Sequence, residues 1–115
     1  MLHYGRQAID EDDIAAVAAV LRSDFLTTGP AVEAFEAAFA QRTGAAHAVA
    51  CANGTAALHL AALALELGPG DSVVVPTVTF LATANAARYV GAEVIFADVD
   101  PDTGLMRAED FERAL

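Results

Sequence analysis

The protein has 115 residues, of which 56% are hydrophobic and 19% are charged, so a disordered chain is excluded and the length is that of one small domain. The formal net charge of −10 argues against nucleic acid or an anionic membrane surface as the main partner. A single cysteine, Cys51, excludes an internal disulfide and fits a reducing compartment. No apolar run is long and uncharged enough to span a membrane, and we expect a cytoplasmic protein.

Two helices are predicted in the first part of the chain. Residues 10–22 begin with four acidic residues, which favour a helix N-terminus, and continue with apolar residues on one stripe. Pro30 suits the first turn of a second helix, and Gly44 suits its C-terminal stop.

From residue 45 onward, short apolar runs alternate with helical stretches. The predicted strands are 46–51, 72–76 and 93–97, and the predicted helices are 55–67, 80–90 and 107–115. Strands that alternate with helices indicate βαβ units and a parallel sheet. The predicted fold class is therefore α/β, with parallel βαβαβ units preceded by two helices. The loops after the strands should converge at one edge of the sheet, where ligands of such sheets bind.

The stretch "CANGTAAL", residues 51–58, follows the first predicted strand. Gly54 would let the backbone turn tightly and bring main-chain N–H groups near a ligand, and Thr55 adds a hydroxyl where a helix begins. One interpretation is a phosphate site at the helix N-terminus. The other is a plain Asn-Gly turn in which Thr55 caps the helix, and the residues alone leave both open.

Phe80 follows the second predicted strand, in "PTVTF". Its ring could stack on a planar ligand at the same edge of the sheet. Packing in the hydrophobic core is the alternative, and for a single phenylalanine it is the more common arrangement.

The stretch "DVDPDTGLMRAE", residues 98–109, superficially resembles a calcium-binding loop, because three aspartates alternate and Glu109 falls at the twelfth place. The match fails where it matters: Gly104 falls at the seventh place instead of the sixth, Pro101 intrudes, and a strand precedes the loop. A proline-containing turn and helix cap is favoured. The three histidines and the single cysteine have no metal-ligand spacing, so no metal site is predicted.

Four stretches of the sequence resemble, in order, the N-terminal portion of the pyridoxal-phosphate sugar aminotransferases of the DegT/DnrJ/StrS type. They are "YGRQAIDEDDIAAV", "DFLTTGPAVEAFEAAFA", "ACANGTAALHLA" and "VVVPTVTFLATANAARYVGAEVIFADVDPDTG". The resemblance implies the N-terminal part of the large domain of a fold-type I aminotransferase, with residues 1–44 as a helical arm and 45–115 as part of the cofactor-binding domain. It also implies a homodimer that transfers an amino group, with glutamate as donor, to a nucleotide-linked 4-keto-6-deoxysugar.

The same resemblance implies roles for individual residues. Gly54 and Thr55 would bind the phosphate of pyridoxal 5′-phosphate, and Phe80 would stack on its pyridine ring. The residues expected near the sugar substrate are Tyr4, Thr28 and Gly29.

The sequence contains no lysine, whereas family members use a lysine to form a Schiff base with the cofactor. No catalytic residue is therefore assigned within the 115 residues. Either the sequence is part of a longer enzyme, or it is a shortened relative that binds a phosphorylated ligand or serves as an assembly module without catalysis.

Overall fold

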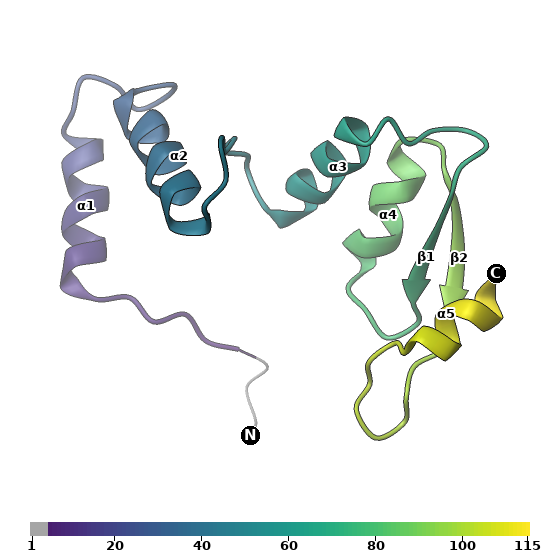
Figure 1. The fold of residues 1–115 in the computed structure, drawn as a ribbon. Coiled ribbons are helices and arrows are strands. Elements are labelled where there is room, and N and C mark those ends of the chain that lie inside the picture. Colours follow the sequence, from purple (N-terminus) through teal and green to yellow (C-terminus); the bar gives the residue numbers. More distant parts are fainter. Residues whose placement is uncertain (1–4) are drawn as a thin grey trace. The chain divides into compact units, whose positions relative to one another are not determined.

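The structure, a computed structural model, describes residues 5–115. The contacts within the chain separate it into two units, one ending at Ala50 and the other running from Cys51 to Leu115. Each unit is described by itself (Figure 1). None of the helices among residues 5–115 combines the length and the apolar character needed to cross a membrane.

The first unit contains two helices, α1 (Glu11–Leu21) and α2 (Pro30–Thr43), which confirm the two predicted helices. Asp10 caps α1: its carboxylate accepts hydrogen bonds from the amides of Asp12 and Asp13 at 3.1 and 3.0 Å. The Asp13 carboxylate accepts in return from the Asp10 amide, which completes a capping box.

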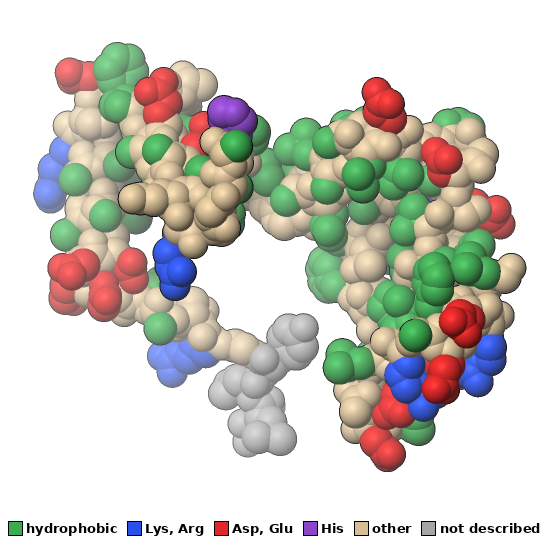
Figure 2. Space-filling model, viewed as in Figure 1, with side chains coloured by type: hydrophobic (Ala, Val, Ile, Leu, Met, Phe, Trp, Pro, Cys, Tyr) green, Lys and Arg blue, Asp and Glu red, His purple; other side chains and the backbone are tan. Residues whose placement is uncertain are grey.

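The ends of α2 lie where its sequence predicts. Pro30 is the first helical residue, and Gly44 ends the helix in the left-handed conformation with φ of 73°. The apolar stripe of α1 is present, but no residue of that helix is buried within the described chain. Figure 2 shows hydrophobic side chains on the surface of both units.

The prediction of a strand at 46–51 is wrong for the described chain. This segment forms no strand and pairs with none among residues 5–115, and Val49 is 79% exposed. Its link to α2 is a hydrogen bond of 2.7 Å from the Ala50 amide to the Glu36 carboxylate. An apolar run forms a strand only where a neighbouring strand supplies the ladder of hydrogen bonds, and the described residues supply none here.

The second unit contains one βαβ unit flanked by two helices. Its elements in chain order are α3 (Gly54–Ala64), β1 (Ser72–Pro76), α4 (Leu81–Tyr89), β2 (Glu93–Ala97) and α5 (Ala108–Ala114). The strands β1 and β2 are parallel, in register from Ser72 opposite Glu93 to Pro76 opposite Ala97. The α/β class and the parallel pairing are confirmed, whereas the described residues contain one βαβ unit instead of the expected βαβαβ.

The core of the second unit is built largely from alanine. The α4 helix contacts α3 and both strands, and Figure 1 shows it beside α3 and against the sheet. Its buried residues are Ala82, Ala84, Ala86 and Ala87. Because alanine is small, the backbones of α3 and α4 can approach closely, and the starts of the two helices come to lie at the same cleft.

Candidate functional site

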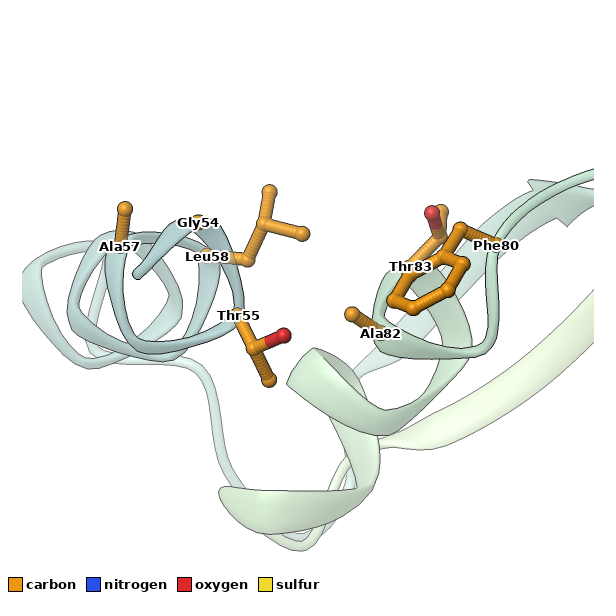
Figure 3. Close-up of a pocket in the computed structure, with 7 residues that line it drawn as sticks. All are labelled: Gly54, Thr55, Ala57, Leu58, Phe80, Ala82 and Thr83. Carbon is orange, nitrogen blue, oxygen red and sulfur yellow. The ribbon is translucent and has the colours of Figure 1, made fainter. Parts of the chain in front are cut away.

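A surface cleft of about 570 Å³ lies between the first turns of α3 and α4. Its lining residues are Gly54, Thr55, Ala57, Leu58, Phe80, Ala82 and Thr83. Figure 3 shows Thr55 and Leu58 on one side, facing Phe80 and Ala82 on the other. The structure therefore brings together the three residues that the sequence singled out for the cofactor, namely Gly54, Thr55 and Phe80.

The start of α3 leaves hydrogen-bond donors free at this cleft. Asn53 is the N-cap, and its side chain accepts a hydrogen bond from the Ala56 amide at 2.9 Å. Within residues 5–115, the amides of Gly54 and Thr55 donate no hydrogen bond. The first amides of a helix lack intrahelical acceptors and carry the positive end of the helix dipole, so this position suits an anion.

Two details at the start of α3 differ from the sequence interpretation. Thr55 does not cap the helix, because Asn53 already supplies the capping oxygen. Gly54 is the first helical residue and has no left-handed φ, so the turn does not require glycine. A Cβ added at Gly54 would meet no atom of the described chain within 4 Å. Its missing side chain therefore leaves open space beside the free amides.

Phe80 does not pack in the core. It is the N-cap of α4 and is 76% exposed, and its ring borders the cleft (Figure 3). An exposed ring at the rim of a cleft is available to stack on a planar ligand.

Sequence reasoning missed four lining residues, Ala57, Leu58, Ala82 and Thr83. A detectable pattern was present for two of them: Leu58 lies three residues after Thr55, and Thr83 lies three residues after Phe80. Residues at this spacing share one face of a helix. The predicted helices at 55–67 and 80–90 were therefore sufficient to place both on the ligand side.

Two of the three residues expected near the sugar belong to the first unit. Thr28 has a left-handed φ of 51°, and its hydroxyl donates to the Thr27 carbonyl at 2.8 Å. Gly29 is the N-cap of α2, and a Cβ there would lie 2.6 Å from the Phe25 Cβ, so the local packing itself requires glycine. Tyr4 lies outside the described residues.

The acidic loop after β2 is organised by ion pairs. The Asp100 carboxylate accepts from the amides of Asp102 and Thr103 at 3.0 and 2.9 Å and pairs with the Arg107 guanidinium at 3.1 Å. The hydrogen bond from the Thr103 amide is the main cause of the lowered pKa of Asp100. This geometry fits the turn and helix cap, and residues 5–115 contain no cluster of three metal-ligating side chains.

Asp110 lies at the centre of the same ion pairs, with only 1% of its side chain exposed. Its carboxylate accepts from Arg107 Nε at 2.9 Å and from the Arg107 amide at 3.0 Å, and it also pairs with Arg113. The hydrogen bonds from Arg107 lower the pKa of Asp110 from 3.8 to about 2. Sequence reasoning did not identify this buried carboxylate, because an aspartate in a helix is ordinarily exposed.

Residues 7–115 match the DegT/DnrJ/EryC1/StrS aminotransferase family. The chain belongs to this family. It is 48% identical over 97 residues to the UDP-4-amino-4-deoxy-L-arabinose–oxoglutarate aminotransferase of Shewanella sediminis. The matched region covers 84% of this chain and 25% of that protein. The chain thus spans about a quarter of the length of this relative.

Solved structures of the family share the fold. The apo form of Spr1654 from Streptococcus pneumoniae, assigned as a sugar aminotransferase, matches 99% of this chain and 29% of its own with 34% identity and a TM-score of 0.86. Its pyridoxal-phosphate form matches 94% of this chain and 28% of its own, with 36% identity and a TM-score of 0.84. An aminotransferase from Psychrobacter cryohalolentis matches 94% of this chain and 28% of its own, with 35% identity and a TM-score of 0.83.

These matches confirm three sequence-based predictions. The family is confirmed, the α/β fold agrees with part of the large domain of the aminotransferases, and the cofactor of the family is pyridoxal 5′-phosphate. A pyridoxamine-phosphate form of Spr1654 has also been solved.

Proposed function

We propose that the chain forms the phosphate and ring-stacking side of the pyridoxal-phosphate site in a sugar-nucleotide aminotransferase. In this proposal, residues 1–44 are a helical arm and residues 45–115 are part of the large domain. The observation that carries it is the convergence of the Gly54 and Thr55 amides and the Phe80 ring on one cleft.

The phosphate would bind at the start of α3. The residues that line the cleft carry no charge, and the chain as a whole carries a formal charge of −10. The long-range field therefore repels an anion, and attraction must come from donors at short range. The free amides of Gly54 and Thr55 and the Thr55 hydroxyl are such donors, and the open space at Gly54 admits a phosphate oxygen.

The pyridine ring would lie against Phe80. Leu58 and Ala82 add apolar surface to the same cleft, so a ring placed there loses contact with water. Stacking on an aromatic ring contributes about 0.5–1.5 kcal/mol beyond area burial. When bound, pyridoxal phosphate supplies the electron sink for transamination.

The substrate we propose is a UDP-linked 4-keto-6-deoxysugar, with glutamate as donor. The name of the Shewanella relative includes two compounds, a UDP-linked 4-amino sugar and oxoglutarate. The sequence also resembles the transaminase that makes UDP-4-amino-4,6-dideoxy-N-acetyl-β-L-altrosamine, on the route to pseudaminic acid. In the proposed reaction, the amino group of glutamate replaces the keto oxygen of the sugar, and glutamate leaves as 2-oxoglutarate.

Four further assignments stay predictions. Tyr4, Thr28 and Gly29 are proposed to lie on the sugar side, the complete enzyme is proposed to be a homodimer, and its location is expected to be the cytoplasm. The Schiff-base lysine would come from outside these 115 residues, which contain none. The downstream coding sequence tests this last assignment: an in-frame lysine in a Ser/Gly-rich context supports the enzyme, and a stop codon after Leu115 favours a non-catalytic binding or assembly module.

The binding site itself is tested with pyridoxine 5′-phosphate, which has the ring and the phosphate but no aldehyde. Calorimetric titrations compare it with pyridoxine and with inorganic phosphate, and amide NMR locates the bound ligand. We expect the phosphorylated ring to bind most tightly and to shift the amides of Gly54 and Thr55. Thr55→Val should weaken it and the matched control Thr77→Val should not. Equal affinity for pyridoxine, or shifts confined to other residues, would contradict the proposal.

A further inference from the structure

The start of α4 departs from the usual chemistry of a helix N-terminus. N-cap positions favour Ser, Thr, Asp or Asn, whose side-chain oxygens accept hydrogen bonds from the first amides. Here the N-cap is Phe80, which makes no side-chain capping hydrogen bond. With a mostly exposed ring, Phe80 serves neither the cap nor the core. Departures from local rules of this kind concentrate at functional positions.

Two threonines span Phe80 and join their side chains. The hydroxyl oxygens of Thr79 and Thr83 lie 2.9 Å apart, and either hydroxyl can donate the hydrogen bond. The Thr83 amide also donates to the Phe80 carbonyl at 3.0 Å. Two hydrogen bonds thus close the first turn of α4. One joins side chains on either side of Phe80, and the other joins the backbone to the Phe80 carbonyl.

We propose that the Thr79–Thr83 hydroxyl pair is a positioning device that directs the Phe80 ring into the cleft. Thr79 precedes Phe80 and Thr83 lies on the cleft wall, so the pair fixes the backbone on both sides of the ring. Both threonines are β-branched, which restricts their χ1 angles and keeps the two hydroxyls in register. They act through Phe80, and the identity of the ligand that meets the ring rests on the proposed function.

The Thr79–Thr83 hydrogen bond is exposed. Its effect on the orientation of the Phe80 ring can therefore be measured separately from its effect on folding. Loss of an exposed hydrogen bond between two neutral groups has a small effect on global stability, because water can replace the lost partner. Water cannot replace the effect of this bond on the orientation of Phe80. No other described side chain forms a hydrogen bond across the first turn of α4.

The test uses Phe80→Trp as a reporter, because the protein contains no other tryptophan. In this background, time-resolved anisotropy without ligand measures the mobility of the ring. We expect Thr79→Val and Thr83→Val each to increase the mobility of Trp at position 80, and Thr83→Ser, which keeps the hydroxyl but loses the β-branch, to increase it less than Thr83→Val. The control is Thr77→Val, a threonine of the same loop outside the pair.

With Phe80 in place, each valine variant should weaken the binding of pyridoxine 5′-phosphate by about two- to tenfold, the range of one modest hydrogen bond. The double variant should bind no more weakly than either single variant, because both remove the same contact. Thermal unfolding midpoints should stay near wild type. Should Thr83→Val fail to fold, Thr79→Val decides the question, because Thr79 lies outside the helix.

Unchanged ring mobility in both valine variants would overturn the positioning role, and so would additive losses of affinity. A wild-type protein that binds no pyridoxine 5′-phosphate would instead contradict the proposed function. The mobility measurement needs no ligand, so it would still decide whether the pair positions the ring.

Discussion

Replacing Gly54 with alanine should separate ligand binding from folding. Gly54 has no left-handed φ, and an added Cβ would meet no atom within 4 Å, so the folded chain accepts alanine without strain. Substitutions of this kind stabilise a protein by about 0.4–1 kcal/mol, because alanine restricts the unfolded chain. The unfolding temperature should therefore rise by a few degrees, at roughly 4–8 °C per kcal/mol for a small domain.

The same methyl group would occupy the open space from which a phosphate oxygen is proposed to approach the free amides. A hydrogen bond to a charged group contributes about 1.5–3 kcal/mol. Losing one such bond should weaken the binding of pyridoxine 5′-phosphate by roughly 10- to 150-fold. Gly54→Ala should thus be more stable and a weaker binder at once.

Circular dichroism measures the unfolding temperature, and calorimetric titration measures the affinity. Gly68→Ala is the matched control: Gly68 has no left-handed φ, its added Cβ would meet only the Val90 carbonyl oxygen at an ordinary 3.8 Å, and it does not line the cleft. Wild-type affinity in Gly54→Ala would refute the close approach of the phosphate. A lower unfolding temperature would refute the account of the helix start.

Three other outcomes are expected. Val75→Ala, at a position 2% exposed in β1, should lower the free energy of unfolding by about 2 kcal/mol in a urea titration, since two buried methyl equivalents are lost and a cavity remains; an unchanged midpoint would contradict this packing. The pKa of Asp110 is about 2 in the folded protein and 3.8 ordinarily, so its stabilising effect is complete above pH 3.8 and is lost as pH falls toward 2. Asp110→Asn should flatten this part of the curve of unfolding temperature against pH, and an unaltered curve would assign the acid sensitivity to other groups. Finally, the 115-residue chain mixed with pyridoxal phosphate and reduced with borohydride should carry no pyridoxyl group on an internal residue by peptide mass analysis and should not transaminate a keto sugar, since it has no lysine; turnover would contradict the need for an outside lysine.

Much of the local structure could be predicted from the sequence, because its causes are local. Asp10 caps a helix with its own side chain, and Pro30 and Gly44 mark helix ends through their backbone preferences. A topological rule for parallel sheets led to the expectation that Thr55 and Phe80 lie together. In the structure they line one cleft because α3 packs against α4, and the strand expected before Thr55 is absent from residues 5–115.

The predictions that failed concern contacts whose partners are distant or ambiguous in the sequence. An apolar run such as 46–51 indicates a capacity for strand pairing but does not identify the strand that pairs with it. Asn53 and Thr55 both carry a capping oxygen, and the choice between them depends on where the chain turns. The burial of Asp110 depends on the course of the loop that brings Arg107 over it, and no periodicity encodes that course.

The donors proposed for the phosphate are main-chain amides and one hydroxyl, and neither kind of group titrates near neutral pH. With a lysine or histidine in their place, the affinity for phosphate would depend on the protonation state of that side chain. In this cleft the pH dependence should belong to the ligand, whose second phosphate ionisation has a pKa of about 6. Affinity should therefore rise as the phosphate monoanion becomes a dianion and then stay level. Because amides belong to the backbone, proline is the only residue type that deletes one. All other natural variation can weaken this recognition only by blocking access to the amides or by displacing the helix.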